Sequence, residues 1–260
     1  MITIYWGIDP LSIPEGIRID PPVPIMNKFV KDRIPEDLAD EITYNKCPAF
    51  FNELKNVYGM KSVYDYGIKI KGEEISINSP ISLSQNKQQE QSFFKSHVNF
   101  RSMKGNLFSF HQGLVFFTEN PSLTMSQLPA FMEDNNIVKN TICIPGQLDI
   151  GKYFRTLDFA WHFRKGCNTI DFSRKEISFY LKFHTKEKIK FQRFLFTPEL
   201  VNLNETMMRA KNVKNPEPLT QVLNFYYNIF DKYNFKNKML KIIKENLCKE
   251  EDLEGNVVTR

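Results

Sequence analysis

The segment LDFAWHFRKGCNTIDFSRKEISFYLKFHT, residues 157–185, shows most directly which fold this chain adopts. Its apolar residues recur at every second position in three runs: Phe159, Trp161 and Phe163; Ile170 and Phe172; and Ile177, Phe179, Leu181 and Phe183. Because side chains of a β-strand alternate between two faces, this spacing predicts three strands that each bury one face. Gly166 and the polar residues 173–175 mark the turns between them. Such spacing is typical of an antiparallel sandwich or barrel.

The overlapping segment ISFYLKFHTKEKIKFQRFLFT, residues 177–197, predicts how the third run continues. The polar residues TKEK indicate a turn and the apolar alternation resumes at Ile189, so we predict a hairpin with one buried face. Tyr180 and the lysines fall on the opposite, wet face because a strand alternates, which requires no polyanion to explain it. Phe194 is out of phase with this pattern, which predicts a bulge near Gln192–Arg193.

The flanking regions differ from this body in composition. Six prolines fall in the first 40 residues, and they predict an extended arm because proline lacks an amide donor and restricts the residue before it. Residues 35–42 and 48–57 predict short helices, and residues 66–79 predict a hairpin. Beyond residue 218, apolar residues spaced by three and four predict helices with one apolar face.

We therefore predict an α+β, β-rich fold, with an antiparallel β-sandwich or jelly-roll-like body, an N-terminal arm and C-terminal helices. The proline-rich arm and short helices occupy residues 1–62, the antiparallel β body residues 63–200, and the helical C-terminal segment residues 201–260, all packed as one unit. The 23 phenylalanines supply large apolar side chains for a substantial core.

Several functional classes lack their sequence signals. No run of about 18 apolar residues predicts a membrane-spanning helix, and the first 16 residues do not form a secretory signal. The four cysteines include no C-x-x-C pair that would indicate a zinc or redox motif. Residues 146–152, GQLDIGK, have the glycine and lysine spacing of a phosphate-binding loop, but Tyr153 stands where that loop needs Ser or Thr. We predict a turn between strands there.

Positive charge is concentrated in the second half of the chain, which has a net charge of +5 overall. Residues 151–200 contain eleven Lys and Arg against five Asp and Glu, and residues 201–250 contain nine against five. Such asymmetry is compatible with nucleic-acid binding through residues 151–250 and also with an ordinary solvated surface.

A polar cluster in FRTLDFAWHFRK, residues 154–165, provides the candidate ligand-binding residues Arg155, Asp158, His162 and Arg164. On a strand, Asp158, His162 and Arg164 share the face opposite Phe159, Trp161 and Phe163. If that face lines a pocket, the cluster suits an anionic ligand. If it faces solvent, the same residues form an ordinary ion pair of little energetic value.

A candidate metal site rests on His111 and Glu119. His111 follows Gly105 at the spacing of the first cupin motif, and Glu119 lies where the acid of that motif falls. Gly113 stands in place of the second histidine, and no histidine follows Pro145–Gly146 at the distance that the second motif requires. Such a site would lack at least two ligands.

Five phrases resemble a family of tailed-bacteriophage proteins, marine ones among them, whose function is unknown. They are PVPIMNKFVKD, KCPAFFNELKNVYGM, FFTENPSLTMSQLPAFMED, IPGQLDIGKYFR and YLKFHTKEKIKFQRF, within residues 20–200. The resemblance implies a phage origin, a place in the host cytoplasm or the virion, and a proline-rich arm followed by a helix and a β-rich body. It carries no activity and no catalytic residue.

Three functions stay open at this point. The first is a phage-encoded accessory or structural protein that binds a partner protein or a second copy of itself, with no membrane involved and no cofactor assigned. The second is a double-stranded β-helix enzyme of the cupin or oxygenase type, which would hold Fe(II) or another divalent metal at His111 with Glu119 or His162. The third is nucleic-acid binding through the basic second half. No catalytic residue is assigned.

Overall fold

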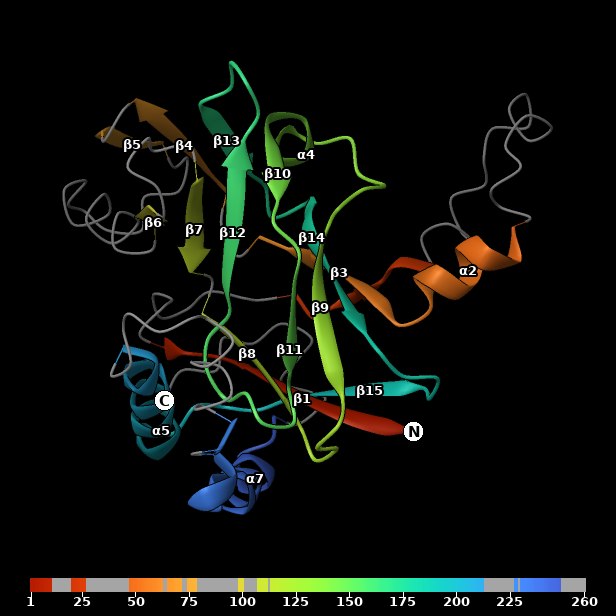
Figure 1. The fold of residues 1–260 in the computed structure, drawn as a ribbon, viewed down its shortest axis with the longest axis vertical. Helices are drawn as coiled ribbons and strands as arrows, with labels where there is room; N and C mark the ends of the chain where they lie inside the picture. Colours follow the sequence, from red (N-terminus) through yellow and green to blue (C-terminus); the bar gives the residue numbers. More distant parts are fainter. Residues whose placement is uncertain are drawn as a thin grey trace.

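The computed structural model describes residues 1–10, 20–26, 47–62, 65–71, 74–78, 98–100, 107–111, 113–212, 227–228 and 230–248. Within these ranges the strands form four sheets with helices packed around them (Figure 1). The predicted β-rich α+β fold built on antiparallel sheets is therefore confirmed. The helix expected at residues 35–42 lies outside the described residues. None of the described helices has the length and apolar character needed to cross a membrane.

One sheet of five strands has β14 (Ile177–Phe183) at its centre. Its strand order is β11 (Gly146–Asp149), β9 (Thr124–Pro129), β14, β3 (Val57–Lys61) and β2 (Val23–Pro24). Phe179 on β14 faces the main core, whereas the next residue, Tyr180, packs into a second, smaller cluster with Leu54. Both aromatic side chains are fully buried. The prediction of a wet face at Tyr180 is wrong because this sheet is covered on both sides.

A second sheet carries three of the six predicted site residues, namely His111, Asp158 and His162. Its strand order is β10 (Thr141–Cys143), β12 (Asp158–Phe163), β7 (Leu107–His111) and β6 (Val98–Phe100). Phe159, Trp161 and Phe163 on β12 are buried, which confirms the buried face expected from their alternation. The opposite face of β12 therefore displays Asp158 and His162.

A third sheet contains the one parallel pairing among the described strands. Its order is β15 (Ile189–Arg193), β1 (Ile2–Ile8) and β8 (Leu114–Thr118), and β1 runs parallel to β15 with Ile2 opposite Ile189. The predicted hairpin of residues 177–197 is wrong, because β14 pairs with β9 and β3 while β15 pairs with β1. Alternation identifies the faces of a strand but not its neighbour.

The bulge predicted near Gln192–Arg193 is also wrong. The pairing of β15 with β1 stays in register through Arg193, and the Phe194 N–H continues it by donating to the Trp6 carbonyl over 2.9 Å. The register shift of this region lies instead between Ile177 and Phe179, where β14 pairs with β3. Phe194 is 1% exposed because it pairs with Leu247 beyond α7 and packs its ring against Phe154 and Phe196.

The fourth sheet confirms the hairpin expected at residues 66–79. Its order is β13 (Thr169–Phe172), β4 (Tyr66–Lys71) and β5 (Glu74–Asn78), with Lys71 opposite Glu74 across the turn. Tyr66 stacks on Phe172 of β13 at 4.6 Å and on Phe110 of β7 at 5.1 Å between ring centroids. These contacts join the fourth sheet to the second.

The helices lie at the periphery of the sheets. They are α2 (Pro48–Leu54), α4 (Asn136–Asn140), α5 (Pro198–Asn212) and α7 (Phe235–Glu245). Figure 1 shows α5 and α7 together at the end of the molecule where the sheet of β1 and β8 lies, and α2 on the far side beyond β3. Helix α2 ends before the expected Val57, because Asn56 adopts a left-handed φ of 57° and Val57 begins β3.

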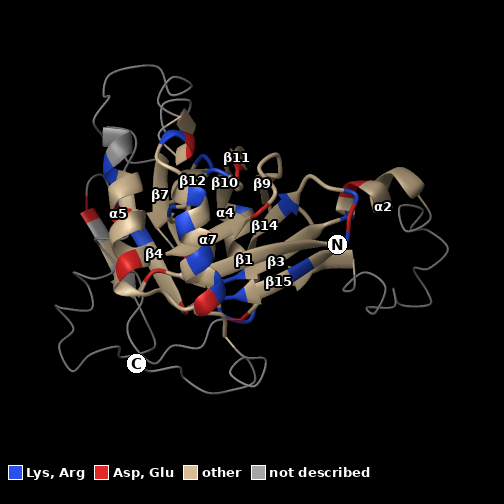
Figure 2. Cartoon of the chain, turned by 90° about the horizontal axis from the view of Figure 1, so that it is seen from below, with Lys and Arg blue, Asp and Glu red and all other residues tan. Residues whose placement is uncertain are grey.

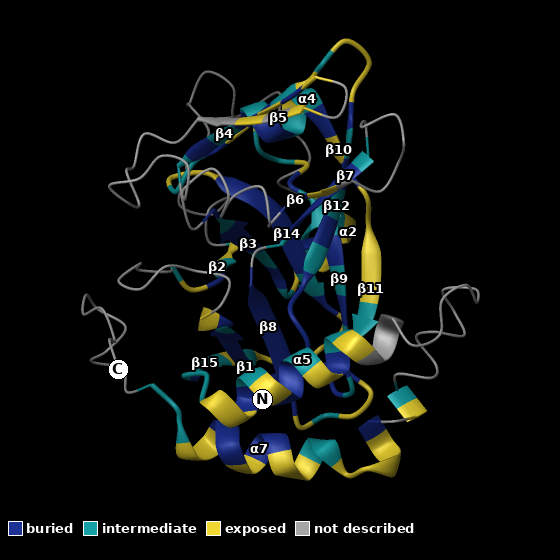
Figure 3. Cartoon of the chain, turned by 90° about the vertical axis from the view of Figure 1, so that its left-hand side faces the viewer, coloured by how far each residue is buried: buried dark blue, intermediate teal, exposed yellow. Residues whose placement is uncertain are grey.

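One core joins all four sheets and the C-terminal helix. It includes Ile4 of β1, Phe179 of β14, Trp161 of β12, Ile68 of β4 and Ile243 of α7. Buried residues run along the strands in Figure 3, while the outward faces of α5 and α7 and the strand β11 are exposed. Described residues of the segments 1–62, 63–200 and 201–260 thus share one core, and the N-terminal segment contributes the strands β1, β2 and β3, whereas most of the expected arm lies outside the described residues.

Candidate functional site

The outer face of β7 and β12 brings together residues that the sequence placed in two separate sites. His111 lies directly opposite Asp158 in the antiparallel register, and Ser109 lies opposite Ala160. Directly opposed residues in such a pair have Cβ atoms about 5 Å apart. The candidate metal ligand His111 and the candidate ligand-binding residue Asp158 are therefore close neighbours on one face of the sheet.

His162 lies on the same face but at a distance. It is opposite Leu107 and four residues along β12 from Asp158, which corresponds to about 13 Å at the rise of an extended strand. One small ion cannot touch His111, Asp158 and His162 together. In the described ranges, no group of three His, Cys, Asp or Glu side chains converges as a metal centre would require.

The two candidate arginines lie at opposite ends of β12 and in different environments. Arg164 follows the strand and is exposed. Arg155 precedes the strand and is only 8% exposed. The four predicted ligand-binding residues therefore do not form one pocket, because burial separates Arg155 from the outer face and Arg164 lies beyond the far end of β12.

Arg155 belongs to a loop, residues 150–157, that is almost entirely buried between β11 and β12. Helix α5 covers this loop through Asn204, whose Oδ1 accepts from the Thr156 N–H over 3.1 Å. The Nδ2 of Asn204 donates to the buried Asp9 carboxylate, which follows β1, over 2.8 Å. Asn204 thus links the end of β1 to the loop before β12 within the interior.

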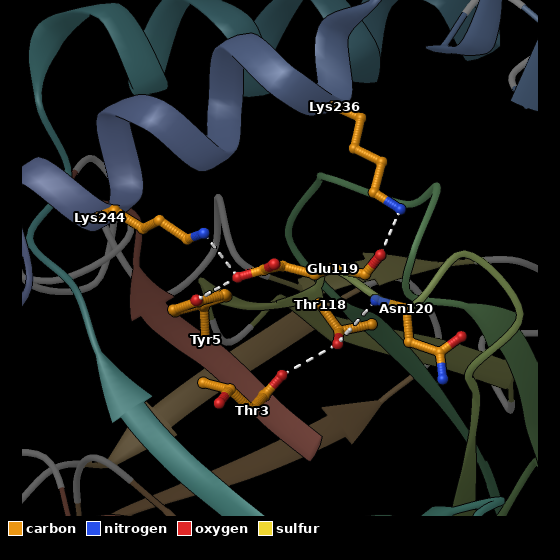
Figure 4. A network of polar contacts seen from close by, with 7 residues as sticks. All are labelled: Thr3, Tyr5, Thr118, Glu119, Asn120, Lys236 and Lys244. Carbon is orange, nitrogen blue, oxygen red and sulfur yellow. Dashed lines mark hydrogen bonds and ion pairs between the residues drawn. The ribbon is translucent and has the colours of Figure 1, made fainter. Parts of the chain in front are cut away.

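Glu119, the second candidate metal ligand, lies on the neighbouring sheet at the end of β8 and is engaged by protein groups (Figure 4). The Tyr5 hydroxyl of β1 donates to its carboxylate over 2.8 Å, and Lys244 of α7 forms an ion pair with it over 2.8 Å. Lys236, on the first turn of α7, donates to the Glu119 carbonyl. Glu119 therefore holds α7 against β1 and β8.

The protonation behaviour of this network follows from its contacts. Hydrogen bonds from Lys244 and then Tyr5 stabilise the carboxylate and lower the pKa of Glu119 below its usual value. Burial, followed by the hydrogen bond to Glu119, raises the pKa of Tyr5. Tyr5 thus stays protonated and donates whenever Glu119 is ionised.

We expect the Glu119 contacts to weaken in acid. The folded pKa lies below the unfolded value of about 4.3, so unfolding takes up a proton between these two values and stability falls as the pH decreases from about 5. The loss of stability should be under about 1 kcal/mol, because the Glu119 side chain is 52% exposed.

Urea unfolding followed by circular dichroism at several pH values tests this expectation. The free energy of unfolding of Glu119→Gln should fall less on acidification than that of the wild type. Glu245→Gln, at an exposed glutamate of α7, should behave like the wild type. Equal acid dependence of Glu119→Gln and wild type would contradict this assignment.

Five of the basic side chains in the second half of the chain form ion pairs among the described residues: Lys152, Lys182, Arg209, Lys238 and Lys244. Figure 2 shows lysines and arginines spread over α7, α5 and the β14–β15 region, with acidic residues among them. Lys238 pairs with Glu199 over 2.9 Å and Lys152 with Asp231 over 2.8 Å. Nucleic-acid binding by residues 151–250 stays a prediction.

A short exposed segment, residues 142–147, was not singled out by its sequence. Ile142 is 45% exposed and Ile144 is 40% exposed, and both lie on the outer face because the intervening Cys143 is buried. Residues 144–147 are all exposed. The segment contains the two isoleucines, a proline and no charge, which is the signal that could have identified it. The link between Asp9 and Asn204, 195 residues apart, left no sequence signal.

The chain was compared with known proteins by sequence. Neither the models of protein families nor the curated proteins gave a match.

Proposed function

We propose that this protein is an assembly protein that acts by binding protein, and that the exposed segment of residues 142–147 binds a second copy of the chain. In keeping with the resemblance noted from the sequence, we place it among phage-encoded accessory or structural proteins of the host cytoplasm or the virion. The observation that carries the proposal is the pair of exposed isoleucines, Ile142 and Ile144, at the boundary between two sheets.

The position of this segment suits an intermolecular contact. It begins in β10, the outer strand of one sheet, and ends in β11, the outer strand of another. Outer strands carry main-chain groups that face away from their sheet and are available to another chain. Pro145 limits further main-chain pairing because it has no amide donor, so the isoleucine side chains supply the contact.

Charge and symmetry favour a second copy as the partner. The chain has a net charge of +5, so two copies repel one another in most relative orientations. Residues 142–147 carry no charge, so two copies that meet through this segment bring no like charges of the segment together. In a two-fold dimer each residue of the contact meets the same surface on the other chain. An apolar, uncharged segment is compatible with itself in such an arrangement, and burial of two isoleucines on each side stabilises it.

The mass in solution tests this proposal. Size-exclusion chromatography with light scattering, over a range of protein concentrations, should give the wild type a mass that rises from 30.6 kDa toward twice that value. The double variant Ile142→Ser/Ile144→Ser should stay at the monomer mass. Tyr233→Ser is the matched control, since it removes an aromatic side chain that is 60% exposed elsewhere, and it should dimerise like the wild type. A monomeric wild type, or a dimer unaffected by the isoleucine substitutions, would reject the proposal.

A further inference from the structure

A serine and a histidine form a short hydrogen bond on the outer face of the five-stranded sheet. Ser126 lies in β9, and His184 directly follows β14, the strand that pairs with β9 (Figure 1). The Ser126 Oγ and the His184 Nε2 are 2.6 Å apart. Both side chains point away from the main core, because their chain neighbours Met125 and Phe183 lie in it. The pair thus joins the two residue types that serve as nucleophile and base in acyl transfer.

The backbone holds the histidine in place from both sides. The His184 N–H donates to the Thr124 carbonyl of β9 over 3.0 Å, and the Phe183 N–H donates to the Asn56 carbonyl over 3.0 Å. The Asn56 Nδ2 also donates to the Thr185 carbonyl over 2.7 Å. Functional groups that are carried by paired strands keep their mutual geometry better than groups on free loops.

Two charged residues surround the pair. Lys182 of β14 lies directly opposite Ser126 in the register of the sheet, which places their Cβ atoms about 5 Å apart. The Lys182 ammonium forms an ion pair with Glu53 of α2. Burial lowers the pKa of His184, and the charge of Lys182 lowers it further, while Glu53 acts in the opposite direction. The imidazole is therefore neutral at neutral pH and is able to take up a proton.

The same face of the sheet continues into apolar side chains. Leu128, two residues beyond Ser126 on β9, lies opposite Tyr180 of β14. Both pack in the smaller apolar cluster with Leu54 and Phe50 of α2. Leu128 and Phe50 are only partly buried, so they keep surface that a small apolar acyl group can cover.

We propose that Ser126 is a nucleophile, with His184 as its general base, for the hydrolysis of esters of small apolar acyl groups. The Ser126 Oγ bonds to the acyl carbon while the His184 Nε2 takes the hydroxyl proton, in the tautomer that carries its own proton on Nδ1. The bond from the acyl carbon to the alcohol oxygen then breaks, and His184 gives the proton to the departing alcohol. Water, activated by the same imidazole, releases the acyl group as a carboxylic acid and restores Ser126. Lys182 stabilises the negative charge that forms on the carbonyl oxygen.

The full chain can be tested with p-nitrophenyl acetate as the probe. We expect a burst of p-nitrophenol, and mass spectrometry of acid-quenched peptides should locate the acetyl group on Ser126. Ser126→Ala should lose the burst and the label, and His184→Gln should be acylated about 100-fold more slowly or less. Ser122→Ala is the matched serine control, because Ser122 is exposed and its hydroxyl bonds to Asn120 rather than to a histidine. It should be acylated like the wild type.

The pH dependence of acylation separates a base from a structural partner. The wild-type rate should rise with pH through the pKa of His184, below about 6.5, and then level off. His184→Gln should lack this inflection. His162→Gln, at a histidine of another sheet, should keep it and so controls for catalysis by imidazole at large.

Three results would overturn the proposal: equal acylation of the wild type and Ser126→Ala, an acetyl group on Lys182 in place of Ser126, and an inflection that persists in His184→Gln. Circular dichroism checks that each variant is folded, and His184→Gln keeps the test valid if Ser126→Ala does not fold. The double variant Ile142→Ser/Ile144→Ser should be acylated like the wild type, because Ile142 lies in β10 of another sheet and Ile144 just after it. The hydrolytic site and the self-association are therefore tested independently.

Discussion

Replacing Phe179 with alanine is expected to lower the free energy of unfolding by about 4 kcal/mol, the typical loss for a fully buried aromatic side chain. Phe179 has no exposed surface and lies in the middle of β14, the central strand of its sheet. Its ring centroid is 4.3 Å from that of Phe159 on β12. The alanine variant would leave a cavity between these two sheets in addition to losing the burial of the ring.

The loss at Phe179 can be measured by urea denaturation followed by tryptophan fluorescence, since Trp161 packs near Phe179 with ring centroids 6.5 Å apart. Lys190→Ala is the control, because Lys190 is exposed on β15, and it should change the free energy by less than about 0.5 kcal/mol. A loss below about 1.5 kcal/mol for Phe179→Ala would mean that the two sheets are not packed together through this ring.

Gly151→Ala is expected to destabilise the fold by about 3 kcal/mol, the upper end of the usual cost of overpacking. A Cβ at this position would lie 2.2 Å from the Asn120 carbonyl oxygen and 2.7 Å from the Pro121 Cα. Both are backbone atoms of the turn between β8 and β9, so neither can move aside without shifting that turn. Gly151 thus allows the loop of residues 150–157 to pass close beneath it.

Gly146→Ala provides a matched control five residues earlier. A Cβ on Gly146 meets no atom within 4 Å, so this variant should be as stable as the wild type or slightly more stable, since alanine has less freedom to lose on folding. Thermal unfolding of both variants by circular dichroism makes the comparison. Similar unfolding midpoints for Gly151→Ala and Gly146→Ala would show that the turn at Asn120–Pro121 is not in close contact with Gly151.

The local structure of this chain was readable from its sequence, whereas the partners of its strands were not. Alternation in residues 157–183 identified β12, β13 and β14 and their buried faces, because the two faces of a half-buried strand differ in polarity. The pairing of β14 with β3 and of β15 with β1 joins distant segments. Hydrophobic periodicity shows which face of a strand is buried but not which distant strand pairs with it. The short separation of β14 and β15 in the sequence therefore suggested a hairpin that does not form.

The candidate site was predictable only in part for the same reason. Residue type and spacing identified Arg155 and Asp158 as polar residues next to a buried strand. Their different environments depend on how the loop before β12 is covered by α5, a contact between segments about 50 residues apart, such as Thr156 with Asn204. His111 and Asp158 are neighbours because β7 pairs with β12. Glu119 contacts Lys244 of α7, a residue far along the chain, and the residues around Glu119 in the sequence do not predict this contact.

The parallel pairing of β1 with β15 has a consequence for how the chain is made. Ile2 is paired with Ile189, and the inner strand β1 needs both β8 and β15 to complete its two edges. At about 5–20 residues per second, a ribosome takes on the order of 10 to 40 s to proceed from β1 to the end of β15. Throughout that time one edge of an apolar strand stays open, and pairings between such distant segments also form slowly. Strand β1 is therefore synthesised long before its second edge can be paired, and early pairing with β8 leaves one edge rather than two open to other chains during that time.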